Sequence, residues 1–291
     1  MKKIKYKILF ITATILEKLV AFAGFKFKED GRPQCDFPVV YFMGKRGITP
    51  LNASLHSIYK NWKELPEIKI IVSDDTPGEY ILGKMGKWPR KVTIVPWQEC
   101  AAYFKSLGND NLDHYAAHEL WGKKFAGIQY LCKDERILYT DTDVLWFHNP
   151  KPSFPDTKAP YLMLGQEVSE ACYSEPLVEF LKEDAYQKPP MNSGVTFAQG
   201  TFSHYPKWDV LCDFLAKHPD NRTEQTAFAI FTNLWGRPWN MDEIMIGVED
   251  LTEIIPKRYV EDYKKIYARH YVNTKPWTFW RDYILFIRFK K

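Results

Sequence analysis

The sequence lacks the cysteine spacing of a zinc site or of a disulfide framework. Its five cysteines are odd in number and scattered, without a CxxC pair: Cys35, Cys100, Cys132, Cys172 and Cys212. This usage favours a reducing compartment. Internal repeats and low-complexity segments are also absent, which argues against a repeat architecture and against long polar linkers.

A strong charge of one sign is absent too. The formal net charge is +4, from 40 Lys and Arg against 36 Asp and Glu, and this is too small to predict a nucleic-acid-binding protein. The chain is rich instead in apolar and aromatic side chains, which make up 45% and 16% of its 291 residues. This composition can bury the core of one large α/β domain or of two small ones.

Long unbroken apolar runs are missing, whereas a membrane-spanning helix needs about 18 or more such residues. Residues 8–25 are largely apolar, but Glu17 and Lys18 interrupt them, and four lysines lie within residues 1–7. The larger apolar side chains recur at the three-to-four spacing of one helix face: Ile4, Ile8, Ile11, Ile15, Leu19 and Phe22. We therefore predict a basic, amphipathic N-terminal helix within residues 1–30.

The other end of the chain, residues 278–291, is a tail in which aromatic and aliphatic side chains alternate with Arg281, Arg288, Lys290 and Lys291. Basic and apolar composition at both termini is typical of a peripheral membrane anchor. We expect a cytoplasmic protein that lies on a membrane surface. The alternatives are a type II protein anchored by its N-terminus and, for the tail, a last helix packed on the core.

Short apolar segments alternate with segments of helical spacing in the first half of the chain. Strands are predicted at residues 39–43, 68–72, 92–95 and 137–140, and helices at 48–62 and 109–131. Further on, we predict strands at 161–164 and 195–198 and helices at 205–217 and 223–235, with Thr223 as an N-cap. This order predicts one α/β domain over residues 38–277, Rossmann-like, with helices flanking a mixed, mainly parallel sheet. Its first half should hold a nucleotide or another phosphorylated ligand, although the chain has no Gly-rich phosphate fingerprint.

Two aspartates, Asp141 and Asp143, directly follow the apolar strand at residues 137–140. Residues i and i+2 of a strand point to the same side, so the two carboxylates would repel each other unless a cation lay between them. Hard oxygen ligands suit Mg²⁺ or Mn²⁺. We therefore predict a metal site at the carboxyl end of a buried strand, where open α/β sheets bind their ligands.

Four short blocks carry a resemblance to a known family. They are residues 136–144, residues 192–195 (Asn-Ser-Gly-Val), Glu224-Gln225, and His270 followed by Lys275-Pro276-Trp277. In this order they resemble the GT-A glycosyltransferases, and more narrowly the glycogenin-like retaining family that includes bacterial lipopolysaccharide galactosyl- and glucosyltransferases. The resemblance implies that Asp141, Asp143 and His270 bind Mn²⁺, with Mg²⁺ possible, and that Lys275 pairs with a diphosphate. A solvated Lys275 is the alternative.

The resemblance also implies a site for a nucleotide, taken to be the UDP of a UDP-sugar. Lys124, or the adjacent Lys123, would contact the nucleotide or its phosphates, and Thr142 would offer its backbone. Tyr41 and Gly44, at the end of the first strand, would flank the uracil and ribose. Asp75, or Asp74, would contact the base or ribose. The alternative for these two aspartates is a turn cap before Pro77.

The same family pattern implies catalytic residues. Asn192 and Gln225 would lie near the reactive carbon of the sugar, with Gln225 as a weak nucleophile or charge stabiliser. Glu224 would contact the acceptor hydroxyl. Its alternative role is that of an acidic residue at a helix N-terminus, which the helix dipole favours.

The function implied by the resemblance is metal-dependent transfer of a hexose from a UDP-sugar to a glycan or lipid-linked acceptor, with retention of configuration. Three alternatives use the same residues differently. A haloacid-dehalogenase-like phosphatase also begins with DxD, but there the motif lies near the start of the chain and a Thr or Val stands where this chain has Leu145. A nucleotidyltransferase needs a Gly- and Arg-rich loop. Residues 44–47 (Gly-Lys-Arg-Gly) resemble such a loop only weakly. A non-catalytic glycosyltransferase-like protein would not need all three metal ligands.

Overall fold

The computed structural model describes residues 2–29, 31–73, 76–167, 172–183, 185–247, 253, 261–272 and 276–289. Its helices are α1 (Lys2–Ala23), α2 (Ile48–Asn61), α3 (Gly78–Lys84), α4 (Trp97–Ser106), α5 (Asp110–His118), α6 (Leu120–Cys132), α7 (Glu175–Leu181), α8 (Trp208–Lys217), α9 (Asn221–Trp235) and α10 (Pro276–Asp282). Its strands are β1 (Val39–Met43), β2 (Ile68–Val72), β3 (Val92–Pro96), β4 (Ile137–Thr140), β5 (Val144–Trp146), β6 (Tyr161–Gln166), β7 (Met191–Gln199), β8 (Gly236–Trp239), β9 (Ile244–Ile246) and β10 (Ala268–His270).

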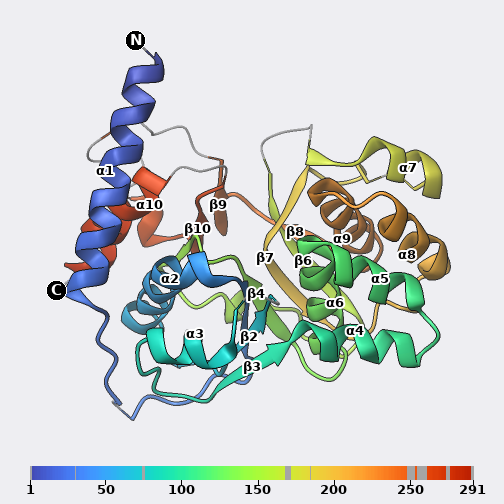
Figure 1. Cartoon of the computed structure of the whole chain (residues 1–291), viewed down its shortest axis with the longest axis horizontal. Coiled ribbons are helices and arrows are strands. Elements are labelled where there is room, and N and C mark those ends of the chain that lie inside the picture. The colour runs from blue at the N-terminus through green and yellow to red at the C-terminus, as the bar shows by residue number, and fades with distance from the viewer. Residues whose placement is uncertain are drawn as a thin grey trace.

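A central sheet organises the molecule (Figure 1). Among the described residues it has seven strands in the order β3-β2-β1-β4-β7-β6-β8. The first four strands of this order are parallel, β7 is antiparallel to both β4 and β6, and β8 is parallel to β6. The predicted mixed, mainly parallel α/β sheet is confirmed.

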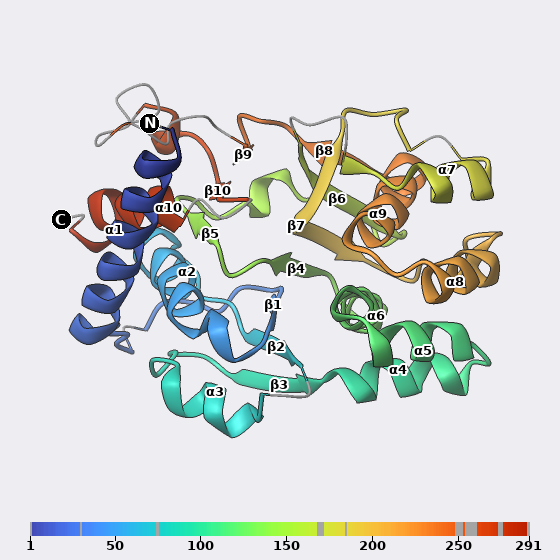
Figure 2. The same cartoon turned by 45° about the horizontal axis from the view of Figure 1, so that its top comes forward.

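Helices cover both faces of this sheet (Figure 2). Side chains of a strand alternate between its faces, so neighbours on β1 enter different cores. Val40 belongs to the core cluster that contains Phe125 of α6, whereas Tyr41 belongs to the cluster that contains Leu55 of α2. The carboxyl ends of β1 and β4 therefore open between two helical layers.

A small second sheet, with the order β5-β10-β9, brings distant parts of the sequence together. Strand β10 pairs antiparallel with β5, and His270 lies opposite Val144. The backbone N–H of Tyr271 also donates to the carbonyl oxygen of Asp143, at 3.1 Å. This pairing fixes His270 beside the aspartates that end β4.

Two details of the predicted helices are wrong. The single helix expected over residues 109–131 is divided into α5 and α6, because Glu119 between them has an extended backbone (φ −129°, ψ 139°). The corner is tight: a Cβ atom on Gly122 would lie 2.3 Å from the carbonyl oxygen of Tyr115. In α9 the N-cap is Asp220, whose carboxylate accepts from the N–H of Thr223, while the Thr223 side chain completes the capping box.

The two chain ends pack on each other. Helix α1 lies along α10 and buries Ala13 and Val20, while Phe279 and Trp280 of α10 are buried in the same cluster (Figure 1). The chain continues from α10 through a π-helical turn, Tyr283–Arg288. Within the described part of the chain, no helix is both long and apolar enough to cross a membrane.

Candidate active site

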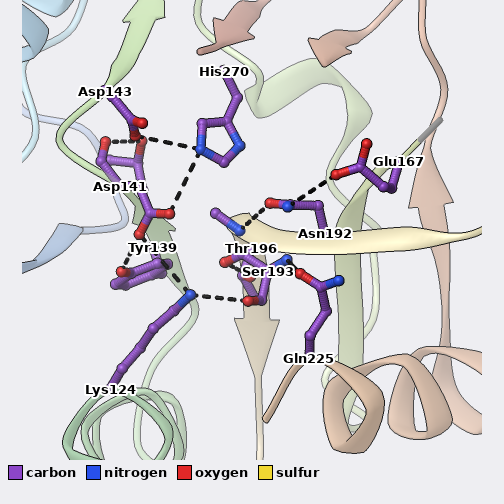
Figure 3. Close-up of polar contacts among 12 residues, drawn as sticks. Lys124, Tyr139, Asp141, Asp143, Glu167, Asn192, Ser193, Thr196, Gln225 and His270 are labelled. Carbon is purple, nitrogen blue, oxygen red and sulfur yellow. Dashed lines mark hydrogen bonds and ion pairs between the residues drawn. The ribbon is translucent and has the colours of Figure 1, made fainter. Parts of the chain in front are cut away.

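The three predicted metal ligands lie together (Figure 3). Asp141 and Asp143 follow β4, and His270 comes from β10 of the small sheet. The Nε2 atom of His270 is 3.3 Å from Oδ1 of Asp143 and 3.6 Å from Oδ2 of Asp141. One ligand atom from each of the three residues falls within 4.8 Å of the others. A single cation could therefore contact all three.

Asp141 is held in place by Tyr139, Lys124 and the backbone of Gly194. Its Oδ1 atom accepts a hydrogen bond from the Tyr139 hydroxyl and lies 3.9 Å from Nζ of Lys124. Its backbone N–H donates to the carbonyl oxygen of Gly194, at 2.8 Å. These contacts leave Oδ2 directed toward His270, as the hydrogen-bond partners of metal-binding carboxylates commonly do.

The electrostatics of the cluster fit a divalent cation. Burial alone would lower the pKa of His270, but the nearby carboxylates of Asp143 and Asp141 raise it. His270 is buried, whereas Asp141 and Asp143 are 30% and 42% exposed, so solvent reaches only the carboxylate side. Two carboxylates and one imidazole suit Mn²⁺ or Mg²⁺, and the exposed side leaves coordination positions open for a ligand.

A buried network lies directly behind this cluster. Nζ of Lys124 donates to Oγ of Ser193 at 2.9 Å and lies 3.3 Å from a carboxylate oxygen of Glu224. The Ser193 hydroxyl in turn donates to the other oxygen of Glu224, at 2.9 Å. Burial raises the pKa of Glu224, and the charge of Lys124 opposes this shift. Lys124 therefore stands between two carboxylates, those of Glu224 and Asp141.

The amides of Asn192 and Gln225 are fixed by different partners (Figure 3). Asn192 accepts from the N–H of Gly194 at 2.8 Å and donates to Glu167 at 3.2 Å. Gln225 donates to the carbonyl oxygen of Cys172 at 2.9 Å and accepts from the backbone N–H of Ser193 at 3.5 Å. Both amides face the same cavity as the metal ligands.

Two cavities meet at Asp141 and Asp143. One, of ≈ 360 Å³, is lined by polar side chains that include Asn192, Gln225 and Glu167. The other, of ≈ 710 Å³, opens at the carboxyl end of β1, where Gly44 and Thr142 line it. Four residues line both cavities: Trp121, Lys124, Asp141 and Asp143. The volumes are those of small-ligand sites. A ligand that occupies both cavities would pass the two aspartates in the shared wall.

Not every predicted residue lies in the site. Tyr41 lines neither cavity: it points to the α2 side of β1, is fully buried, and its hydroxyl is 3.0 Å from that of Ser54. Phe42 and Met43 line the larger cavity. Asp75 and Lys275 lie outside the described residues.

Glu167 and Trp121 line the site but were not predicted from the sequence. Glu167 directly follows β6, and the strand-end rule that identified Asp141 could have identified it as well. Trp121 lies three residues before Lys124 on α6, a spacing that places both on one helix face. The sequence carried these signals, but neither residue belongs to a motif.

Gly194 provides a test of the metal cluster. A Cβ atom at this position would lie 2.0 Å from Cε1 of His270 and 2.7 Å from Oδ2 of Asp141. Because both ligands must then shift, we expect Gly194→Ala to weaken Mn²⁺ affinity by about 10–100-fold, as for other changes next to a ligand shell. Calorimetric titration with Mn²⁺ measures this. Gly83→Ala is the control, since nothing lies within 4 Å of its Cβ position, and equal affinities for the two variants would contradict the assignment.

The comparisons with known proteins find similarity in fold. No protein-family model matches the chain, and no curated protein matches it. Mouse xyloside xylosyltransferase 1 is similar, with a TM-score of 0.54 and 11% identity, over 83% of this chain and 99% of that chain. The galactosyltransferase LgtC, in complex with donor and acceptor sugar analogues, is similar with a TM-score of 0.53 and 9% identity, over 82% of this chain and 88% of that chain. The bifunctional glycosyltransferase WbbM is similar with a TM-score of 0.56 and 10% identity, over 91% of this chain and 52% of that chain. The chain has the predicted GT-A glycosyltransferase fold.

Proposed function

We propose that this protein is a metal-dependent glycosyltransferase that moves a hexose from a UDP-sugar to a glycan or lipid-linked acceptor, with retention of configuration. The observation that supports this best is the convergence of Asp141, Asp143 and His270, because the two aspartates of this cluster lie in the wall shared by two cavities. One cavity can take the nucleoside and the other the sugar with its acceptor. The GT-A fold supports the same reading.

The larger cavity is assigned to the nucleoside. Gly44 and Thr142 line it, and Phe42 and Met43 offer an apolar wall to a base. The diphosphate then lies at the shared wall, beside Asp141 and Asp143. A bound Mn²⁺ or Mg²⁺ would neutralise negative charge on the departing diphosphate. Asp75 is assigned to the base or ribose, as expected from the sequence.

Lys124 and Lys275 are both assigned to neutralise the negative charge of the diphosphate. Lys124 is buried between Glu224 and Asp141, which fixes its ammonium group near the diphosphate position. A preorganised cation at that point stabilises charge as it develops. Lys275 would pair with the diphosphate from the segment between β10 and α10.

The smaller cavity is assigned to the transferred sugar and the acceptor. The Gln225 and Asn192 amides can hydrogen-bond to sugar hydroxyls, and the Gln225 carbonyl can face the positive charge that develops at the reactive carbon. Glu224 is buried under Ser193 and Lys124, so we assign it to positioning Lys124. Glu167, which lines the cavity, is the carboxylate that we assign to the acceptor hydroxyl in its place. Retention then proceeds by front-face attack, assisted by the departing phosphate.

A donor screen tests the proposal. The full chain is incubated with a panel of UDP-sugars and Mn²⁺, released UDP is measured, and the anomer of the product sugar is read by NMR. We expect one UDP-hexose to be turned over, EDTA to stop the release, and the donor configuration to be kept. Release of phosphate from phosphomonoesters with no release of UDP would support the phosphatase alternative, and an inverted product would contradict retention.

A further inference from the structure

Helix α1 presents a stripe of large apolar side chains to solvent. The stripe consists of Ile8, Ile11, Ile15, Leu19 and Phe22, which are 49–93% exposed. Their three-to-four spacing places them on one face of the helix. Ala13 and Val20, on the other side, are buried against the rest of the protein. The exposed stripe is therefore additional to the face that folding uses.

The stripe is carried on a fixed support. Helix α1 packs along α10, and Arg288, at the end of the π-helical turn, donates to the carbonyl oxygen of Gly24 at 3.1 Å. Phe25 packs against Tyr283, with ring centroids 5.9 Å apart. Phe289 is 71% exposed and directly follows Arg288, whose bond to Gly24 lies just past Phe22, so Phe289 adds an apolar side chain at that end of the stripe.

The net positive charge of the protein is concentrated in helix α1. Residues 2–23 hold five lysines and one glutamate, a sum of 5 − 1 = +4, and the whole chain has a formal net charge of +4. The rest of the chain is therefore neutral overall. Lys7 and Lys18 are exposed beside the stripe. An apolar stripe flanked by lysines is the pattern of a helix that lies in a membrane interface.

We propose that α1 lies flat on a bilayer containing anionic phospholipids, with the stripe from Ile8 to Phe22 inserted among the acyl chains and the lysines among the headgroups. Basic side chains match the negative potential of such a surface. A second copy of the chain fits less well, because α1 offers only Glu17 as a counter-charge for five lysines.

This docking has a consequence for the site, which rests on the proposed function. Since α1 packs on α10 as part of the folded protein, docking would keep the enzyme at the membrane that carries a lipid-linked acceptor. The docking itself needs no glycosyl transfer and can be tested alone.

Vesicle sedimentation tests the proposal with the full chain. Vesicles of phosphatidylcholine with and without 30% phosphatidylserine are compared for wild type and for Ile11→Asp/Ile15→Asp. We expect wild type to bind the anionic vesicles at least tenfold more tightly than the neutral ones. The double variant Ile11→Asp/Ile15→Asp should lose at least tenfold in affinity for the anionic vesicles. High salt should weaken the binding, since it screens the lysines. The matched control, Val210→Asp/Leu234→Asp, changes two apolar residues that are 46% and 47% exposed on α8 and α9 and should bind as wild type does.

Three results would overturn the docking: no binding of wild type to anionic vesicles, equal binding of both double variants, or equal binding to neutral and anionic vesicles. A dimer in size-exclusion chromatography that Ile11→Asp/Ile15→Asp dissociates, without vesicle binding, would assign the stripe to a second copy instead. Thermal unfolding of each variant shows that it is folded. UDP release in solution is read in parallel, so that failure of the enzyme and failure of the docking are distinguished.

Discussion

Asp143→Ala is expected to lower metal-dependent release of UDP by about 1,000-fold, because a divalent cation contributes several kcal/mol to stabilising transition-state charge. Asp143 is the most exposed of the three ligands, at 42%, and lies 3.3 Å from His270. Its removal leaves one carboxylate and one imidazole, too few to hold Mn²⁺ firmly. UDP release at increasing Mn²⁺ concentration measures the effect, and calorimetry should show weakened Mn²⁺ binding.

The variant should keep its fold, since Asp143 is not in the core. Circular dichroism and thermal unfolding are therefore expected to match wild type. Asp156→Ala serves as the control, because Asp156 is an exposed aspartate that lines neither cavity. Undiminished UDP release by Asp143→Ala would refute the metal site. A loss in Asp143→Ala that excess Mn²⁺ restores would show that the carboxylate acts through metal affinity alone.

The sequence predicted the metal site from two different kinds of information. The apolar strand and the i, i+2 spacing of Asp141 and Asp143 were enough to place two carboxylates at the end of a strand. No local pattern indicates that β10 pairs with β5, because such pairing depends on the whole topology. His270 was therefore found only through the resemblance to a family, and the pairing of His270 with Val144 brings it beside the two aspartates.

Other errors arose where tertiary packing overrides local pattern. Tyr41 was assigned to the nucleotide through the family resemblance, yet the alternation along β1 turns it to the α2 side. The helical pattern of residues 109–131 continues through Glu119, and only the close packing at Gly122 shows why the chain turns there. Glu167 was overlooked although it directly follows β6, because it belongs to no motif.

A second large effect is expected from Asp282, in a buried ionic cluster that joins α10 to β10. Asp282 is fully buried, and its carboxylate accepts from Arg269 at 2.8 Å and from Arg281 at 2.6 Å. The hydroxyls of Tyr263 and Tyr271 also donate to it, each at 2.8 Å. Asp282→Ala would leave two buried guanidinium groups without this carboxylate.

Breaking a buried ion pair by removing one partner costs about 3–5 kcal/mol, so Asp282→Ala should lower the free energy of unfolding by that amount. For a chain of this size we expect a fall in Tm of about 10 °C. Urea unfolding followed by circular dichroism measures the loss. Asp282→Asn should also be destabilised, because an amide keeps an acceptor but supplies no negative charge. An unchanged urea midpoint in Asp282→Ala would contradict the cluster's role.

The control is Glu261→Ala, which removes an ion pair with Lys264 whose side chains are 70% and 64% exposed. Such a pair is well solvated, so no measurable change in the free energy of unfolding is expected.

The Asp282 variants also test coupling to the metal site. Arg269 and Tyr271 are the sequence neighbours of His270 and both bind Asp282, so the orientation of His270 depends on this cluster. Mn²⁺ affinity should therefore fall in Asp282→Asn at temperatures where the variant is still folded, whereas Glu261→Ala should bind Mn²⁺ as wild type does.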